Sequence, residues 1–216
     1  MLASVILLLL IAIPVLAQTK ELPKKVELNV PFLCQAPYAN WKMPYKEACE
    51  EAALIMAFSF ANDIDGKTVG KESGKQEILG MVKYQNKKFG GHYDLTAKQT
   101  AKLLNGYYKF ENFKLVYDFT LADMKKELAA GNLVLTPAAG RLLGNRFFKV
   151  PGPIYHFVVF KGYDDKKGEF ITNDPGTRRG RGYRYKYKKA FNAIADWTGD
   201  PKTINSGRKA MLVIYK

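Results

Sequence analysis

The chain has 216 residues, of which 47% are hydrophobic and 25% charged, and its 34 Lys and Arg against 20 Asp and Glu give a formal net charge of +14. This composition excludes a disordered tail, a collagen-like fibre and a multi-span membrane protein, and it fits one globular domain. Two cysteines cannot build a disulfide scaffold, and no CxxC or Cys/His cluster suggests structural zinc. The excess of positive charge indicates anionic partners or surroundings.

The N-terminus reads as a transport signal. Residues 1–17 are apolar, and no charged side chain occurs before Lys20. The run is shorter than the roughly 20 residues that span a bilayer as a helix. Val15 and Ala17 place small residues at the −3 and −1 positions of a signal-peptidase site. We expect a cleaved signal peptide, with an uncleaved membrane anchor or a buried core helix as alternatives. A signal or an anchor makes the domain secreted or otherwise extracytoplasmic.

The rest of the chain is predicted to form a short polar tether at 18–25 and one domain at 26–216. Apolar periodicity and capping residues predict a strand at 26–34, helices at 47–61, 75–88 and 96–105, and a further helix from Thr120 to Gly131. The 47–61 helix is apolar on nearly every face, which indicates a central, buried position.

After Gly131 the pattern becomes β. Strands are predicted at 132–137, 155–161, 169–173, 182–188 and 210–215, with one helix at 189–197. Helices followed by strands predict an α+β domain, in which a helical half packs on an antiparallel sheet.

Cys49 is the candidate nucleophile. It falls in the first turn of the buried helix, where free backbone N–H groups and the helix dipole stabilise a thiolate. Glu50 and Glu51 oppose ionisation, but successive 100° steps around the axis are expected to turn them away from Cys49. Cys34 follows an apolar run and is interpreted as a small buried hydrophobic residue, with a Cys34–Cys49 disulfide as the alternative.

A nucleophilic thiol needs a base, and the chain has two histidines. His92 follows two glycines and is interpreted as an exposed loop residue. His156 opens an apolar strand, and the hairpin that follows brings Asp174 opposite or diagonal to it, depending on whether the turn centres on residue 165 or 166. A slip by one residue would offer Asn173 instead. Each register supplies a group that can orient an imidazole.

Gln35 lies in a loop fourteen residues before Cys49, and its side-chain amide is the type of donor that an oxyanion hole requires. The chain resembles the C39-like cysteine peptidases, relatives of the bacteriocin-processing double-glycine peptidases in the papain-fold clan. The residues that carry this resemblance are Val30-Pro31-Phe32, Gln35, Trp41, Ala48-Cys49-Glu50, Ala53, Met56, His156-Phe157-Val158-Val159, Gly162-Tyr163-Asp164, Asn173-Asp174-Pro175-Gly176, Tyr185, Phe191 and Trp197.

The resemblance implies a papain-like fold with Cys49 as nucleophile, His156 as base and Asp174 as the group that orients it. Gln35 and the backbone N–H of Cys49 would form the oxyanion hole. The reaction needs no metal or cofactor, and the implied partner is a peptide or protein substrate, including one associated with the cell envelope.

Positive charge concentrates in residues 141–190, which hold 13 Lys and Arg against 4 Asp and Glu. Within 178–189 the tyrosines at 183, 185 and 187 alternate with basic residues. A half-buried strand with its tyrosines inward explains this alternation better than nucleic-acid binding does. For a secreted protein, the expected anion is a cell-envelope polymer or an acidic lipid surface. Arg178, Arg179 and Arg181 are expected at the rim of the substrate cleft.

The sequence therefore predicts a secreted thiol hydrolase that cleaves peptide or amide bonds. Two alternatives stay open. One is a non-catalytic envelope-binding module on the same fold, and the other is a thiol acyltransferase in which an amine replaces water.

Overall fold

One antiparallel sheet organises the part of the chain that the computed structural model describes, residues 21–216. Six strands follow one another in the order β2-β7-β3-β4-β5-β6, and β1 pairs with β4. The predicted signal peptide at 1–17 and the start of the tether lie outside the described residues. The strands are β1 (Lys25–Glu27), β2 (Phe113–Tyr117), β3 (Leu133–Ala139), β4 (Tyr155–Asp164), β5 (Glu169–Asn173), β6 (Arg181–Lys186) and β7 (Ala210–Ile214). The helices are α1 (Cys49–Ala61), α2 (Lys71–Lys88), α3 (Ala97–Tyr108), α4 (Leu121–Ala129), α5 (Gly140–Leu143) and α6 (Tyr187–Ala193), with 3-10 turns at Tyr45–Glu47 and Ile204–Ser206.

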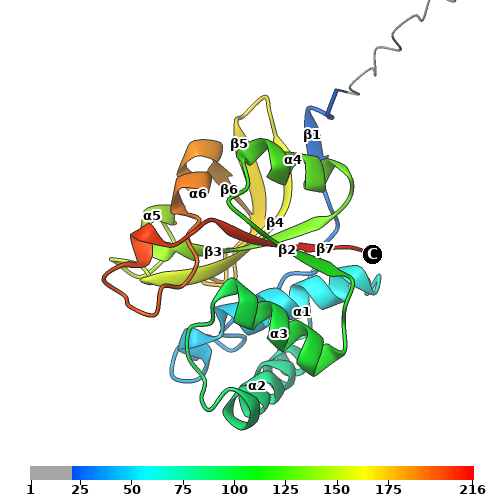
Figure 1. Ribbon diagram of the computed structural model, residues 1–216. Helices are drawn as coiled ribbons and strands as arrows, with labels where there is room; N and C mark the ends of the chain where they lie inside the picture. The colour runs from blue at the N-terminus through cyan, green and yellow to red at the C-terminus, as the bar shows by residue number, and fades with distance from the viewer. Residues whose placement is uncertain (1–20) are drawn as a thin grey trace, which may run out of the picture.

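Helices cover both faces of the sheet (Figure 1). Leu135 and Phe157 point to the face that packs against α1. Val134 and Val158 point to the opposite face, where they pack with Met124 of α4. Because alternate strand residues face opposite sides, two covered faces leave β3 and β4 buried along their whole length. The predicted α+β architecture is confirmed.

α1 is the buried helix that the sequence predicts, and it packs directly on β4 and β3. It begins at Cys49 and not at residue 47, because a 3-10 turn over Tyr45–Glu47 precedes it. Cys49 is therefore the first residue of the helix, and the backbone carbonyl of Ala48 accepts the N–H of Ala52.

Several boundaries differ from the prediction. α2 begins four residues earlier than expected, at Lys71, and its first turn includes Gly74, where a Cβ would lie 2.5 Å from Leu33. β2 was not predicted; it is an edge strand that pairs with β7 and is only partly buried. β6 ends at Lys186, so Tyr187 is the first residue of α6 and not a strand residue in line with Tyr185.

The β4–β5 hairpin contains a β-bulge that decides which residue faces His156. Near the turn, Gly162 pairs with Ile171, but beyond the bulge Val159 pairs with Asn173, one register step away. If the register of the Val159–Asn173 pair is extended toward His156, Asp174 lies diagonal to His156 and on the same face of the sheet. This matches the predicted register in which the turn centres on residue 166. Without the bulge the two side chains would point to opposite faces.

Candidate active site

The side chain of Cys49 is almost fully buried at the N-terminus of α1, with only 4% of the residue exposed. Its Sγ donates a hydrogen bond to Oε2 of Glu50 at 3.0 Å. The pKa of the Cys49 thiol lies well above its ordinary value, first because burial disfavours the thiolate and then because Glu50 and Asp94 are negative neighbours.

The expectation that Glu50 points away from Cys49 is therefore wrong. The Glu50 carboxylate turns back toward the start of α1, where its Oε1 accepts the backbone N–H of Leu95 at 2.8 Å and its Oε2 accepts the thiol of Cys49. This tether to the 92–95 segment is a long-range contact that a helical wheel does not contain. In this conformation the thiol is neutral, and the helix N-terminus does not by itself produce a thiolate.

The interpretation of His92 as an exposed loop residue is also wrong. Its side chain is 6% exposed, and Nε2 lies 3.0 Å from Oε1 of Glu51, close enough for an ion pair although at an angle unsuited to a hydrogen bond. Glu51 is itself buried and accepts a hydrogen bond from Gln85. Burial lowers the pKa of His92, but Glu51 outweighs it and the net pKa is raised. Nearby, burial and Glu47 raise the pKa of Asp94 to about 6.

His156 and Asp174 are brought together as the sequence predicts. Nε2 of His156 lies 2.8 Å from Oδ1 of Asp174, and both side chains are buried. Asn173, the alternative partner, is occupied elsewhere, because its amide donates to the backbone carbonyl of Val30 and accepts from Gly182.

Two further residues hold Asp174. Its Oδ2 accepts hydrogen bonds from Asn145 Nδ2 at 2.9 Å and from the Tyr185 hydroxyl at 2.5 Å, and its Oδ1 also accepts the backbone N–H of Gly176. Burial alone would raise the pKa of Asp174, but the charge of His156 and these hydrogen bonds outweigh it, so the pKa is lowered. Sequence reasoning missed Asn145 in this role, because it lies in the 144–152 loop, far from Asp174 along the chain. For Tyr185, the sequence alternation predicted a side chain that points into the protein, and that was the available signal for its contact with Asp174.

Gln35 is buried beside the start of α1 and joins two parts of the site. Its backbone N–H donates to the carbonyl of Pro175, one residue after Asp174. Its side-chain Nε2 donates to the carbonyls of Tyr45 and Lys46 at 3.0 Å each, and Oε1 has no hydrogen-bond partner among the described residues. Both amide hydrogens are therefore engaged. The role of Gln35 as an oxyanion donor stays a prediction, and it requires one of these hydrogen bonds to be exchanged.

Cys34, the neighbour of Gln35, is buried and free, and so is Cys49. The two cysteines form no disulfide in this structure. Burial raises the pKa of the Cys34 thiol, which fits the interpretation of this residue as a small core side chain.

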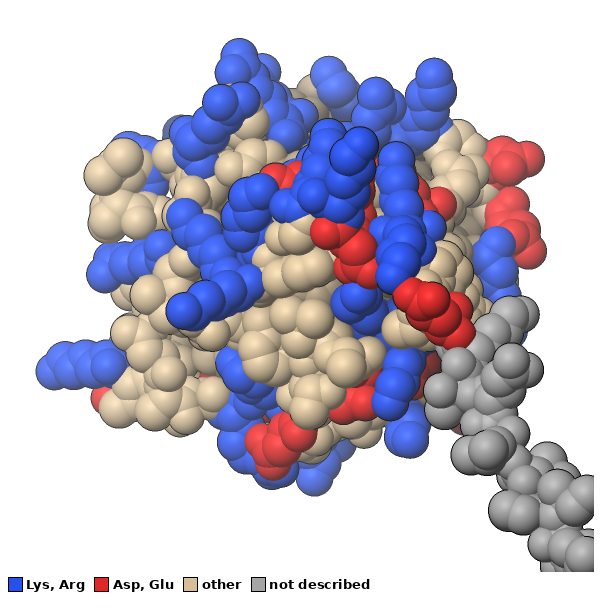
Figure 2. Space-filling view, turned by 90° about the horizontal axis from the view of Figure 1, so that it is seen from above, with Lys and Arg blue, Asp and Glu red and all other residues tan. Residues whose placement is uncertain are grey.

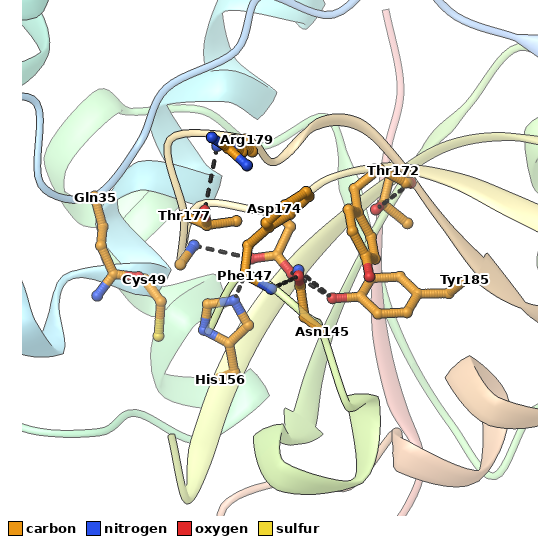
Figure 3. Close-up of polar contacts among 12 residues, drawn as sticks. Gln35, Cys49, Asn145, Phe147, His156, Thr172, Asp174, Thr177, Arg179 and Tyr185 are labelled. Atoms are coloured by element: carbon orange, nitrogen blue, oxygen red, sulfur yellow. Dashed lines mark hydrogen bonds and ion pairs between the residues drawn. The ribbon is translucent and has the colours of Figure 1, made fainter. Parts of the chain in front are cut away.

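The close-up in Figure 3 shows how these groups lie. The His156 imidazole is set between Cys49 and Asp174, with one ring nitrogen bonded to the carboxylate and the other on the side of Cys49. The Cys49 thiol engages Glu50, and no hydrogen bond links it to His156 among the contacts of residues 21–216. The arrangement provides a thiol, a base with an orienting carboxylate, and a nearby amide.

A family model of the peptidase C39-like family matches residues 27–202, which is most of the chain. The chain belongs to the peptidase C39-like family. Two solved structures share its fold. A C39-like peptidase from Bacillus anthracis is 18% identical with a TM-score of 0.56, over 89% of this chain and 98% of that one. Xylellain, a cysteine protease from Xylella fastidiosa, is 16% identical with a TM-score of 0.52, over 91% and 87%. Among curated proteins the comparison gives no match. The expected papain-like, C39-like fold is confirmed.

The basic residues of segment 141–190 in this C39-like domain differ in whether they form ion pairs, and those in the middle of β6 do. Figure 2 looks onto the side that carries the β4–β5 turn and α4, where Lys and Arg predominate and acidic side chains are set among them. On β6, Arg184 approaches Asp164 at 3.5 Å, and Lys186 lies 3.0 Å from Glu169. Tyr185, between them in sequence, is buried as predicted. This part of 178–189 is thus an ion-paired, half-buried strand.

Neither a metal centre nor a membrane-spanning helix is found in the described part of this C39-like domain. Within residues 21–216, no group of three or more His, Cys, Asp or Glu side chains could hold a metal ion. No helix in the same range is long and apolar enough to cross a bilayer.

Proposed function

We propose that this C39-like domain is an extracytoplasmic thiol hydrolase that cleaves peptide or amide bonds, with Cys49 as nucleophile, His156 as general base and acid, and Asp174 as the orienting carboxylate. The contact between His156 Nε2 and Asp174 Oδ1 carries the proposal, because it leaves the other ring nitrogen toward Cys49. Membership of a peptidase family supports the reaction class.

In the proposed reaction, the Cys49 thiol leaves Glu50 and passes its proton to the free nitrogen of His156. Sγ then bonds to the carbonyl carbon of the substrate. The imidazolium, stabilised by Asp174, gives the proton to the departing amine, and the C–N bond breaks. Water, deprotonated by His156, attacks the thioester and releases the acid and the thiol. The N–H of Cys49 and the amide of Gln35 would bind the oxyanion.

The test combines alkylation with hydrolysis. Labelled casein should be hydrolysed by the wild-type protein. Iodoacetamide should label Cys49 slowly near neutral pH, because the thiol is buried and its pKa is raised, and faster as the pH rises. Cys49→Ala should abolish both, whereas the matched variant Cys34→Ala should leave both near the wild-type level. Hydrolysis that survives Cys49→Ala would contradict the proposal, as would hydrolysis that is lost equally in Cys34→Ala.

A second candidate, a non-catalytic envelope-binding module, is favoured by the burial of Cys49 and by its contact with Glu50, which hold the thiol neutral. It predicts salt-sensitive binding to an anionic polymer that is unchanged by Cys49→Ala, with no hydrolysis at any pH. If turnover occurs, mass analysis of the products formed in the presence of an added amine separates hydrolase from acyltransferase, because a transferase gives an amide in place of an acid.

The extracytoplasmic location rests on the apolar run at 1–17. Expression of the full chain followed by mass analysis of the released protein tests it. Cleavage after Ala17 gives a mature chain that begins at Gln18. An uncleaved chain in the membrane fraction supports the anchor, and a full-length chain in the cytoplasm contradicts both.

A further inference from the structure

Two segments beside His156 carry cations that have no acidic partners among residues 21–216. Residues 140–152 include α5, residues 176–181 end on the first residue of β6, and neither segment contains Asp or Glu. None of their basic side chains forms an ion pair within residues 21–216, and all are exposed. They are Arg141, Arg146, Lys149, Arg178, Arg179 and Arg181. They differ in this respect from Arg184 and Lys186, the ion-paired cations further along β6.

Two of these arginines converge on one aromatic ring. The guanidinium of Arg146 lies 4.7 Å from the centre of the Phe147 ring, and that of Arg179 lies 5.0 Å from it. A guanidinium over a ring keeps its N–H edges free for a carboxylate. Because both guanidinium groups lie within 5.0 Å of the same ring centre, one bound peptide segment can reach both.

The arginine pair lies on the His156 side of the site. Phe148, next to Phe147, packs edge-on against the His156 imidazole with 5.3 Å between ring centres. Figure 3 shows Arg179 on the loop that follows Asp174. The backbone N–H of Arg179 donates a hydrogen bond to the Thr177 hydroxyl there. A hollow of about 180 Å³ opens beside Phe148, between α5 and the 148–152 loop, and Val150, Pro151 and Arg141 also contribute to its lining. It has room for a substrate side chain next to Arg141.

The opposite side of the site is acidic. Glu50, Glu51 and Asp94 surround the start of α1, and His92 accompanies them. Glu50 and Glu51 are each only 1% exposed and burial raises the pKa of Glu50, so these acids add little negative charge to the surface. A peptide lying across Cys49 and His156 thus meets exposed positive charge on the His156 side, with no comparable exposed charge from Glu50 and Glu51 near the helix. In the proposed mechanism His156 protonates the departing amine, so the part of the substrate that follows the scissile bond lies on the His156 side.

From this asymmetry we infer that Arg146 and Arg179 select peptide substrates that carry Asp or Glu in the residues following the scissile bond. The inference rests on the proposed function and names the substrate class of that site. An extended peptide fits the arrangement better than a flat lipid surface does, because the two guanidinium groups converge on one ring and the neighbouring Phe148 lines a hollow. Carboxylate is the group that arginine binds in a bidentate manner.

Binding is measured without turnover in the Cys49→Ala protein. The probes are two fluorescein-labelled ten-residue peptides, one of alternating Glu and Ala and one of alternating Gln and Ala. At low salt the Glu peptide should bind about tenfold more tightly than the Gln peptide, as expected for charge-assisted contacts. Adding Arg146→Gln and Arg179→Gln should remove this preference. The control pair, Lys114→Gln and Lys202→Gln, changes the net charge equally at exposed positions away from these loops and should preserve it.

Cleavage specificity gives the second readout, with the intact enzyme and an unfolded protein mixture mapped by mass spectrometry. Asp and Glu should be enriched after the cleaved bonds, and the enrichment should disappear in the double Arg variant while cleavage persists. Enrichment before the bond, no enrichment, or an equal loss in the double Lys variant would overturn the inference. If the wild-type protein cleaves nothing, the proposed function is contradicted. The binding assay would still decide the inference. Arginine-dependent binding to vesicles with 30% anionic lipid, without discrimination between the peptides, would assign the surface to a membrane and also overturn it.

Discussion

Glu50 accepts the thiol hydrogen of Cys49 at 3.0 Å while its other carboxylate oxygen accepts the backbone N–H of Leu95 at 2.8 Å. The thiol in this structure is therefore held away from ionisation by the residue that follows it in the chain. Any thiolate chemistry at Cys49 has to overcome both its burial and this negative neighbour, and the pH dependence of alkylation reports on that barrier.

Glu50→Gln should shift the midpoint of Cys49 alkylation by iodoacetamide to lower pH. Above the pH at which Glu50 ionises, its charge raises the pKa of the thiol, and glutamine removes that charge. The amide oxygen of glutamine can still accept the Leu95 N–H, so the fold should persist. Glu72→Gln, at an exposed position on α2, is the control and should leave the midpoint in place. An unchanged midpoint in Glu50→Gln would show that Glu50 does not govern the thiol.

Asp94→Asn should remove part of the pH dependence of folding. Burial and the charge of Glu47 raise the pKa of Asp94 from 3.8 to about 6, so between these values the folded state keeps a proton that the unfolded chain has lost. The stabilisation is complete below pH 3.8 and is lost as the pH rises through 6, by a maximum of about 3 kcal/mol. Urea unfolding from pH 4 to 7.5 should show a flatter profile in the variant. Parallel profiles in the two proteins would contradict this assignment.

Tyr185→Phe should lower the free energy of unfolding by about 1.5–3 kcal/mol, because it removes a hydrogen bond to a buried carboxylate. Catalysis should also weaken, since Asp174 loses a group that holds it against His156. Tyr183→Phe is the matched control. Tyr183 is less buried, and its hydroxyl accepts only a long 3.4 Å hydrogen bond from the backbone N–H of Arg146. Its loss should be below about 0.5 kcal/mol. Equal effects in urea unfolding would count against the Asp174 network.

Gln35→Ala should lower kcat by about 10²–10³ if Gln35 supplies an oxyanion donor. It should also cost about 1 kcal/mol of stability through the lost contacts with Tyr45 and Lys46. Steady-state kinetics and urea unfolding on the same samples separate the two roles. A stability loss with unchanged kcat would restrict Gln35 to holding the turn before α1.

Much of the fold follows from local patterns in the sequence. The apolar 47–61 segment predicts the central helix, and Thr120 with Asp123 forms the predicted capping box at the start of α4. β5 occupies the predicted residues. β2 escaped prediction because an edge strand that is only partly buried has no clear alternation. Tyr187 continued a sequence alternation, but its N–H bonds to the carbonyl of Gly168 and its hydroxyl to Asp165 as α6 begins.

In the candidate site, too, some features could be predicted from the sequence and others depended on tertiary contacts. Chemistry and chain order made Cys49 and His156 candidates and left Asp174 or Asn173 as the orienting group. The family resemblance then selected Asp174 and Gln35. The contact between His156 and Asp174 depended on a β-bulge in the hairpin, and bulges have no reliable sequence signal. Asn145 and the buried His92 came from loops whose paths are set by packing.

The sequence by itself determined the domain class, the family resemblance and the residue types available for a thiol mechanism, since these depend on composition, periodicity and motif order. Only the tertiary structure decided that Glu50 holds the Cys49 thiol and that the cations at 140–152 and 176–181 form no ion pair with an acidic residue in the described range 21–216. The physical reason is that hydrogen bonds and ion pairs act over a few ångströms. They depend on which distant segments folding brings into contact, and a linear pattern does not contain those distances.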